Sequence, residues 1–221
     1  MLKSKEDLRN FDILLAFLKG DPRVPDGIRW YFSISNKLTA IEILRKDVLE
    51  QIPKCLAEQR SIEEKGYGQG TEALILGIKY EVFLNSIYAL CENLGYVAHC
   101  LLNRKLPEHF HKQKKKLLKT EGLEPTYSKI LAKTTWYDEI HTMRTQSTHY
   151  LSGLITFSSV TAVGYFNMPK VEGGTPPSEI HIQNVEEHVN QIFADVLSFL
   201  SSFGNYFIGL INQENRVARF V

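Results

Sequence analysis

The sequence predicts a mainly helical protein with a small β-hairpin inserted before its C-terminal helix. Apolar residues recur every three or four positions over long stretches, most clearly within residues 71–103 and 185–214. Between these stretches, residues 155–166 are rich in β-branched and aromatic residues, which is typical of strands. A chain of 221 residues is long enough to bury one good core. We therefore expect an up-and-down helical bundle interrupted by two or three short strands, the third of them at residues 179–182.

The N-terminal part, residues 1–66, is expected to form a helical extension packed on a bundle made by residues 67–221. A first helix begins near Ser4 and ends before Gly20, and a turn-rich segment follows it. Apolar spacing then predicts a helix over residues 28–64, which Pro53 should kink or divide. Three glycines within residues 64–70 indicate a hinge before the bundle.

The longest periodic segment, residues 71–103, is expected to be a central helix of the bundle. Its predicted buried face consists of Leu74, Ile78, Val82, Phe83, Ile87, Leu90, Leu94, Val97, Leu101 and Leu102. A short helix should follow at residues 124–133.

A further helix is predicted over residues 136–154, and it carries the strongest concentration of reactive groups in the chain. One face is apolar and should be buried, with Trp136, Ile140, Met143, Ser147, Tyr150 and Leu154. The opposite face, with Arg144 on its flank, carries groups that move protons or hold anions, namely Asp138, His141, Thr145, Thr148 and His149. Any chemistry is expected on this second face.

A basic segment lies between the two helices, with seven basic residues against one acidic residue, Glu108. The basic residues are Arg104, Lys105, Lys112, Lys114, Lys115, Lys116 and Lys119. Such a segment is either a solvated helix face or a strip that contacts RNA phosphates, since lysine and arginine supply the sequence-independent part of RNA binding.

Composition points to a cytoplasmic protein. The net charge is +1, so attraction to nucleic acid must come from local patches. The three cysteines have no CxxC spacing, which is typical of unpaired thiols in a reducing compartment. Two long uncharged runs, residues 151–169 and 196–213, are diluted by Ser, Thr, Asn and Gly, so we expect no membrane partner.

Several kinds of site lack their signatures. Possible metal ligands occur at His99, Cys100, His109 and His111, but no HExxH or paired CxxC motif accompanies them, and no metal or other cofactor is expected. A nucleophile elbow and a phosphate-binding glycine loop are also missing.

Arg144 and His149, separated by four residues on one predicted helix, resemble the signature of the HEPN superfamily, an arginine followed after four to six residues by a histidine. Residues 80–94 are also similar to the long first bundle helix of HEPN proteins. The resemblance covers residues 71–213. A second match, from Arg104 to His109 or His111, contains Pro107 and is not expected to lie on one continuous helix.

The resemblance implies a metal-independent endoribonuclease that acts as a homodimer, with Arg144 and His149 as catalytic residues. It also suggests a toxin or phage-defence setting, in which a protein partner neutralises the enzyme. The alternative is a catalytically inactive HEPN module that binds a nucleotide, RNA or protein. Thr145 departs from the family pattern, which usually places Asn, Asp or His directly after the arginine.

Helix geometry adds an expectation about the dimer. Residues five apart on a straight helix point about 140° apart, so Arg144 and His149 of one chain do not meet easily. A symmetric dimer that pairs these helices would place both copies around one cleft. The simpler alternatives are that His149 is an ordinary exposed histidine and that Arg144 forms an ion pair with Glu139 or Asp138.

Overall fold

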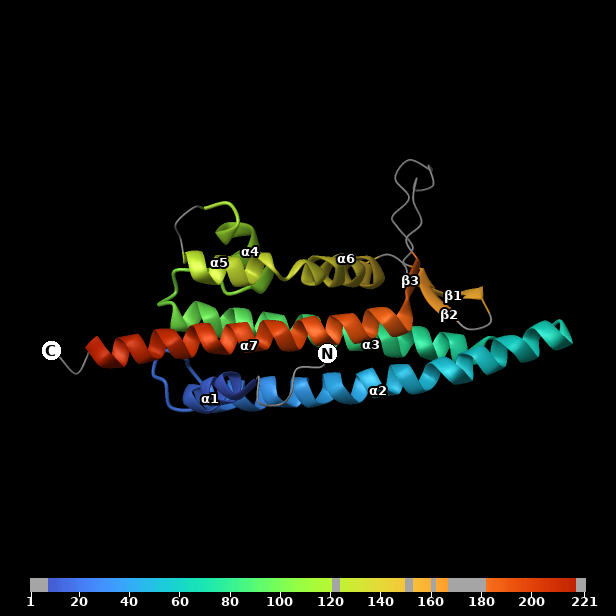
Figure 1. Cartoon of the computed structure of the whole chain (residues 1–221), viewed down its shortest axis with the longest axis horizontal. Helices are drawn as coiled ribbons and strands as arrows, with labels where there is room; N and C mark the ends of the chain where they lie inside the picture. Colours follow the sequence, from blue (N-terminus) through green and yellow to red (C-terminus); the bar gives the residue numbers. More distant parts are fainter. Residues whose placement is uncertain (1–7, 121–123, 150–152, 160–161, 167–181, 218–221) are drawn as a thin grey trace. The chain divides into compact units, whose positions relative to one another are not determined.

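The computed structural model describes residues 8–120, 124–149, 153–159, 162–166 and 182–217. Within these residues the chain forms seven helices and one three-stranded antiparallel sheet (Figure 1). The prediction of a mainly helical protein with a small β insertion is therefore confirmed, and the HEPN-like arrangement of the bundle remains a prediction. The expected start of the first helix at Ser4 and most of the third strand expected at residues 179–182 lie outside the described residues.

The chain folds into two compact units, and each takes segments from both sides of residue 66. The first unit consists of Met1–Leu38, Ala89–Asp138 and Phe193–Val221, and the second consists of Thr39–Tyr88 and Glu139–Ile192. The expected division at residue 66 remains a prediction.

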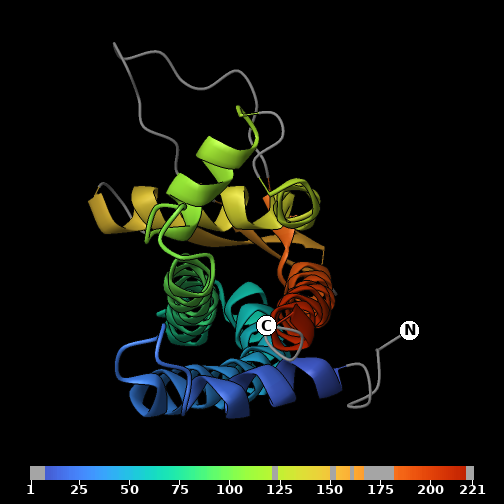
Figure 2. The same ribbon diagram turned by 90° about the vertical axis from the view of Figure 1, so that its left-hand side faces the viewer.

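The first unit is wholly helical in its described part. It contains α1 (Arg9–Leu18), the start of α2 (Gly27–Lys65), the end of α3 (Thr71–Leu101), α4 (Phe110–Leu117), α5 (Pro125–Ala132), the start of α6 (Thr135–His149) and most of α7 (Val185–Val217). Within this unit α3 and α7 lie between α1 and α2 on one side and α4 and α5 on the other (Figure 2).

Aromatic side chains from α1, α5 and α7 pack together in the core of the first unit. Phe203 lies 6.5 Å from Phe11, 6.1 Å from Tyr127 and 4.6 Å from Phe207, measured between ring centroids. Gly204 allows the closest approach of helices here, because a Cβ atom at that position would lie 2.5 Å from the backbone nitrogen of Phe11. Burying such rings supplies much of the free energy that stabilises the unit.

The second unit begins within the long helix α2, at Thr39, and Pro53 neither divides nor ends this helix. The helix continues without a break from Gly27 to Lys65, so the prediction of a division at Pro53 is wrong. The hinge predicted within residues 64–70 forms a short connection between α2 and α3. In this connection Gly66 and Gly70 have φ angles of +77° and +64°. Both angles are in the left-handed region that favours glycine.

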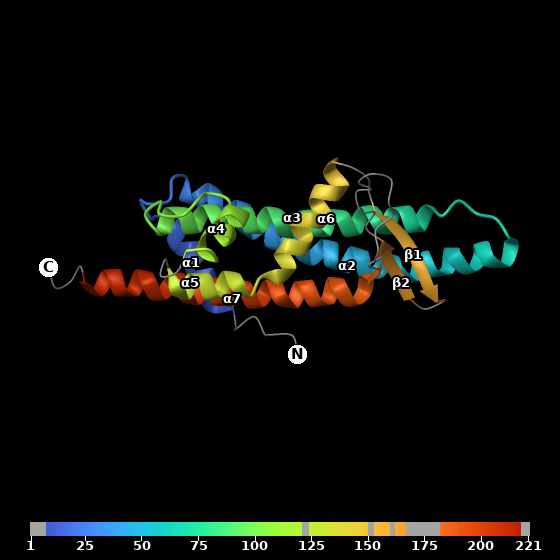
Figure 3. The ribbon, with the colours of Figure 1, turned by 90° about the horizontal axis from the view of Figure 1, so that it is seen from above.

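The sheet of the second unit consists of β1 (Leu154–Ser159), β2 (Ala162–Phe166) and β3 (Ile182–Asn184), in the order β1-β2-β3. Figure 3 shows β1 and β2 side by side. Leu154 pairs with Phe166 across the first two strands. The helix predicted over residues 136–154 is therefore shorter than expected. It is α6 (Thr135–His149), and Leu154, which was expected on its buried face, is an exposed residue of β1. The β-branched and aromatic sequence that begins at Ile155 outweighs the helical spacing.

In the described part of the chain, two helices are long and apolar enough to cross a membrane, Thr71–Leu101 and Val185–Glu214. Core helices of soluble proteins pass the same test of length and composition, so this observation alone does not place the chain in a membrane or outside one. The cytoplasmic location remains a prediction.

Candidate functional site

Arg144 is held against an aromatic ring in the second unit. The Cζ atom of its guanidinium group lies 4.4 Å from the centroid of the Tyr88 ring, which is within the range of a cation–π interaction. Arg144 also lines a small crevice with Glu81, Asn85 and Tyr165. The crevice has a volume of about 10 Å³, enough for about one water molecule. The guanidinium group is thus positioned by α3, and the crevice itself is too small for a substrate.

Two of the predicted supporting residues lie on the turn of α6 next to Arg144. The Thr145 hydroxyl donates a hydrogen bond of 2.8 Å to the backbone carbonyl of His141. This is the usual bond of a helical threonine to the residue four positions earlier, and it uses the only hydrogen of the hydroxyl. The His141 ring lies 5.8 Å from the Tyr88 ring, between centroids. Tyr88 therefore contacts both Arg144 and His141.

His149 is the last residue of α6. Its side chain and that of Thr148 lie outside the described residues, as do those of Ser147 and Tyr150, which were expected on the buried face. Trp136, Ile140 and Met143 from that face are buried as predicted. The described backbone places His149 about 1.4 turns after Arg144 on the same helix, about 7.5 Å along the axis.

Lys114 and Asp138 bond to each other in the first unit, and the supporting role expected of Asp138 remains a prediction. Lys114 is only 4% exposed, and its ammonium group donates hydrogen bonds to the Asp138 carboxylate at 2.6 Å and to the Thr134 carbonyl at 2.7 Å. The side chain faces inward because it shares one face of α4 with Phe110 and Leu117. Lys114 is therefore not available to bind RNA, and Asp138 is engaged by an internal cation.

The other basic residues of the predicted strip are exposed. They are Arg104, Lys105, Lys112, Lys115, Lys116 and Lys119, which we call the basic strip. Lys116 donates a hydrogen bond of 3.1 Å to the carbonyl of Lys105, which joins α4 to the preceding turn.

The carboxylate of Glu92 lies close to three polar rings in the first unit, those of Tyr137, His109 and His111. Glu92 accepts a hydrogen bond of 2.8 Å from the Tyr137 hydroxyl, and its second oxygen lies 3.0 Å from Nδ1 of His109. Nδ1 of His111 is 3.7 Å from the carboxylate. The two histidines are thus held by Glu92, with the basic strip on either side of them in sequence.

The described residues contain no group of three His, Cys, Asp or Glu side chains placed to hold a metal ion. Nδ1 of His99 is 2.5 Å from the Leu106 carbonyl. Cys55, Cys91 and Cys100 are free and buried, and burial raises the pKa of the Cys91 thiol, which keeps it protonated and unreactive at neutral pH.

Two buried polar groups of the second unit were missed by the sequence reasoning. The Tyr80 hydroxyl is hydrogen-bonded to Nδ1 of His188, whose Nε2 atom lies 3.7 Å from Glu139. The Tyr165 hydroxyl donates a hydrogen bond of 2.7 Å to Glu81. Burial raises the pKa of both phenols, so both remain neutral donors at physiological pH.

The missed residues do leave a signal in the sequence. Glu81, Asn85 and Tyr88 recur at helical spacing along α3, and all three lie beside Arg144. The apolar residues that recur along the same helix make this row of polar residues hard to recognise.

No protein-family model matches the chain, and neither a curated protein nor a solved structure matches it.

Proposed function

We propose that this chain is a metal-independent endoribonuclease of HEPN type that acts as a homodimer, with Arg144 and His149 as its catalytic residues. The observation that carries this proposal is the placement of both residues on one unbroken helix, α6, with the guanidinium group of Arg144 positioned over Tyr88. An arginine fixed in this way loses less side-chain entropy when it binds a phosphate than a freely rotating one.

The proposed reaction needs only these two kinds of group. The ribose 2′-oxygen attacks the adjacent phosphorus, a new P–O2′ bond forms, and the P–O5′ bond breaks. An imidazole accepts the proton of the 2′-hydroxyl, and the imidazolium so formed donates that proton to the departing 5′-oxygen. The guanidinium group stabilises the charge that develops on the phosphate oxygens.

A second copy of the chain supplies the group that one helix cannot present. Arg144 and His149 point about 140° apart on α6, and a symmetric pair of α6 helices places an arginine of one copy beside the histidine of the other. The exposed basic strip would hold the flanking RNA by its phosphates, with an affinity that falls as the salt concentration rises.

The test is cleavage of a mixed-sequence RNA in the presence of EDTA. The wild-type protein is expected to cleave, and His149→Ala and Arg144→Ala are each expected to lower the rate by about 100-fold or more. This is the usual scale for loss of a general acid or base and for loss of a group that stabilises developing charge. His109→Ala is the matched control, because His109 is an exposed histidine outside α6, and its rate should equal that of the wild type. Cleavage that requires a metal ion, or that survives His149→Ala, would refute the proposal.

One observation favours the second candidate function, a catalytically inactive HEPN module that binds a nucleotide, RNA or protein. The hydroxyl hydrogen of Thr145 is already used in the bond to His141. The residue after the arginine therefore cannot donate a hydrogen bond to a phosphate as an asparagine would. RNA binding without cleavage in the same assay would assign this function instead.

A further inference from the structure

Two aromatic rings stack in the first unit, where the start of α2 packs against the end of α3. The centroids of the Trp30 and Tyr96 rings are 4.5 Å apart, and the ring planes are 25° from parallel. Both residues are partly exposed. One turn away the Asn93 amide donates a hydrogen bond of 2.9 Å to the Ser33 hydroxyl, which ties the two helices together. The stacked pair is therefore held in place and reaches the surface, where a further ring can stack on it.

Arg104 lies near the same pair and has an unfavourable backbone conformation. Burial raises the pKa of the Tyr96 phenol, and the positive charge of Arg104 opposes this rise, so the guanidinium group is within electrostatic reach of the phenol. Asn103 and Arg104 have φ angles of +52° and +60°, in the left-handed region that favours glycine. The N–H of Arg104 donates a hydrogen bond of 2.8 Å to the His99 carbonyl, which fixes this turn. Strain of this kind is typical of positions that hold a side chain for a function.

The basic strip begins at Arg104, so cations continue from the stacked rings toward α4. Lys105 follows directly, and its carbonyl accepts the hydrogen bond of Lys116. The one acidic residue of the segment, Glu108, lies 3.9 Å from Nε2 of His99. Aromatic rings beside a row of exposed cations are the combination that binds single-stranded nucleic acid, because bases stack on the rings while phosphates contact the cations.

We propose that Trp30 and Tyr96 form a stacking site for an unpaired base of single-stranded RNA, with Arg104 on the adjacent phosphate. The inference rests on the proposed function and deepens it, because it names the form of RNA that the chain holds and the residues that hold it. The site accepts any of the four bases, since each has a face that can stack. Duplex RNA keeps its bases inside the helix and should bind less tightly.

Trp30→Leu tests the stack, with Phe32→Leu as its matched control. Phe32 is 56% exposed on the same helix, but two positions along an α-helix turn it about 200° away from Trp30. The probe is a labelled oligouridine with 2′-O-methyl groups, which lacks the attacking hydroxyl and so binds without being cleaved. In anisotropy titrations Trp30→Leu should raise the dissociation constant at least about fivefold, the lower end for one base stacked on an aromatic ring. No binding by the wild type, or equal affinities of the two variants, would overturn the proposal.

Tryptophan fluorescence reports the same contact in the unaltered protein. The chain has two tryptophans, and the other one, Trp136, is only 7% exposed. A base stacked on Trp30 should quench the emission of the wild type as the oligouridine is added. Trp30→Phe, in which Trp136 is the remaining tryptophan, should show no such quenching. Equal quenching of the two proteins, or none, would refute the stack.

Arg104→Gly separates binding from folding, with Asn103→Gly as its matched control. Glycine adopts a positive φ without a steric cost, so both variants should unfold at a temperature at least as high as the wild type does. Only Arg104→Gly should weaken oligouridine binding, by about threefold or more. It should also lower the slope of log K against log salt concentration by about 0.7, the value for one phosphate contact on a single strand. Equal affinities of the two glycine variants would refute the contact of Arg104 with phosphate.

These outcomes are distinguishable from a failure of the proposed function. Oligouridine binding that shows the expected losses, without cleavage of ordinary RNA, would refute the nuclease and support the stacking site. Cleavage of ordinary RNA together with unchanged binding by Trp30→Leu would refute the stacking site alone.

Discussion

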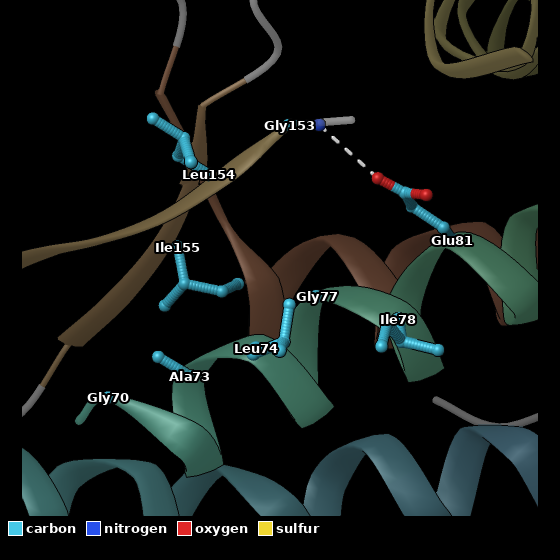
Figure 4. Close-up of a pocket in the computed structure, with 9 residues that line it drawn as sticks. All are labelled: Gly70, Ala73, Leu74, Gly77, Ile78, Glu81, Gly153, Leu154 and Ile155. Atoms are coloured by element: carbon cyan, nitrogen blue, oxygen red, sulfur yellow. Dashed lines mark hydrogen bonds between the residues drawn. The ribbon is translucent and has the colours of Figure 1, made fainter. Parts of the chain in front are cut away.

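Both halves of α3 carry aliphatic residues at helical spacing, but in the second half these residues are buried and in the first half a row of them is exposed. In the second half Leu90, Leu94 and Val97 are fully buried in the first unit, where Gly95 lies against Phe110. In the first half Leu74, Ile78 and Val82 are exposed in the second unit, although the sequence predicted them to be buried. Leu74 and Ile78 line an open pocket between α3 and the start of β1 (Figure 4). Helical spacing thus determines which residues share a face, whereas the rest of the chain determines what covers that face.

The largest effect that separates the two halves is expected from truncating a leucine in each. Leu94→Ala should lower the free energy of unfolding by about 2–5 kcal/mol, because it removes buried methyl groups and leaves a cavity. Leu74→Ala removes the same atoms from an exposed side chain, and in dilute protein it should change the free energy by no more than about 0.5 kcal/mol. Urea denaturation monitored by circular dichroism measures both values. If Leu94→Ala and Leu74→Ala lower the free energy of unfolding by the same amount in dilute protein, the difference between the two halves of α3 would be refuted.

A smaller effect on the free energy of unfolding is expected from replacing two adjacent lysines of α4. Lys114 is buried and Lys115 is exposed, so the pair shows the same contrast as the two halves of α3. Lys114→Met should cost about 1–3 kcal/mol of unfolding free energy, because Asp138 and the Thr134 carbonyl lose a charged donor. Lys115→Met removes an exposed charge and should leave stability unchanged.

The affinity for RNA should depend more on Lys115 than on Lys114, the reverse of their effects on stability. Lys115→Met should weaken binding and make it less sensitive to salt, because one phosphate contact is lost. Gel-shift titrations at two salt concentrations measure this change. Equal losses of stability in the two lysine variants would contradict the internal role of Lys114.

The helices could be predicted from the sequence because each depends on many residues at once. The helix expected over residues 185–214 is α7, Val185–Val217, and the helix expected over residues 71–103 is α3, Thr71–Leu101. The end of α6 was misplaced by several residues, since Leu154 fits the helical spacing as well as it fits a strand. Pro53 was expected to kink or divide α2. It does not divide the helix, because a proline within a helix of 39 residues removes one hydrogen bond and leaves the others.

The surroundings of the candidate site could not be predicted in the same way, because they depend on pairs of residues far apart in sequence. The contact of Arg144 with Tyr88 joins two helices, and so does the bond of Lys114 to Asp138. Charge and spacing along the chain identify Arg144 and Lys114 as cations. Only the packing of the helices shows that Lys114 is buried while its neighbour Lys115 is exposed.

The most direct test of a site shared between two copies is the activity of a purified heterodimer of Arg144→Ala and His149→Ala. Each homodimer lacks one catalytic group at both sites, so both should be inactive. In the heterodimer one of the two sites keeps its arginine from one copy and its histidine from the other, and the rate of RNA cleavage should recover to about half of the wild-type rate. A heterodimer as inactive as the two homodimers would contradict the shared site.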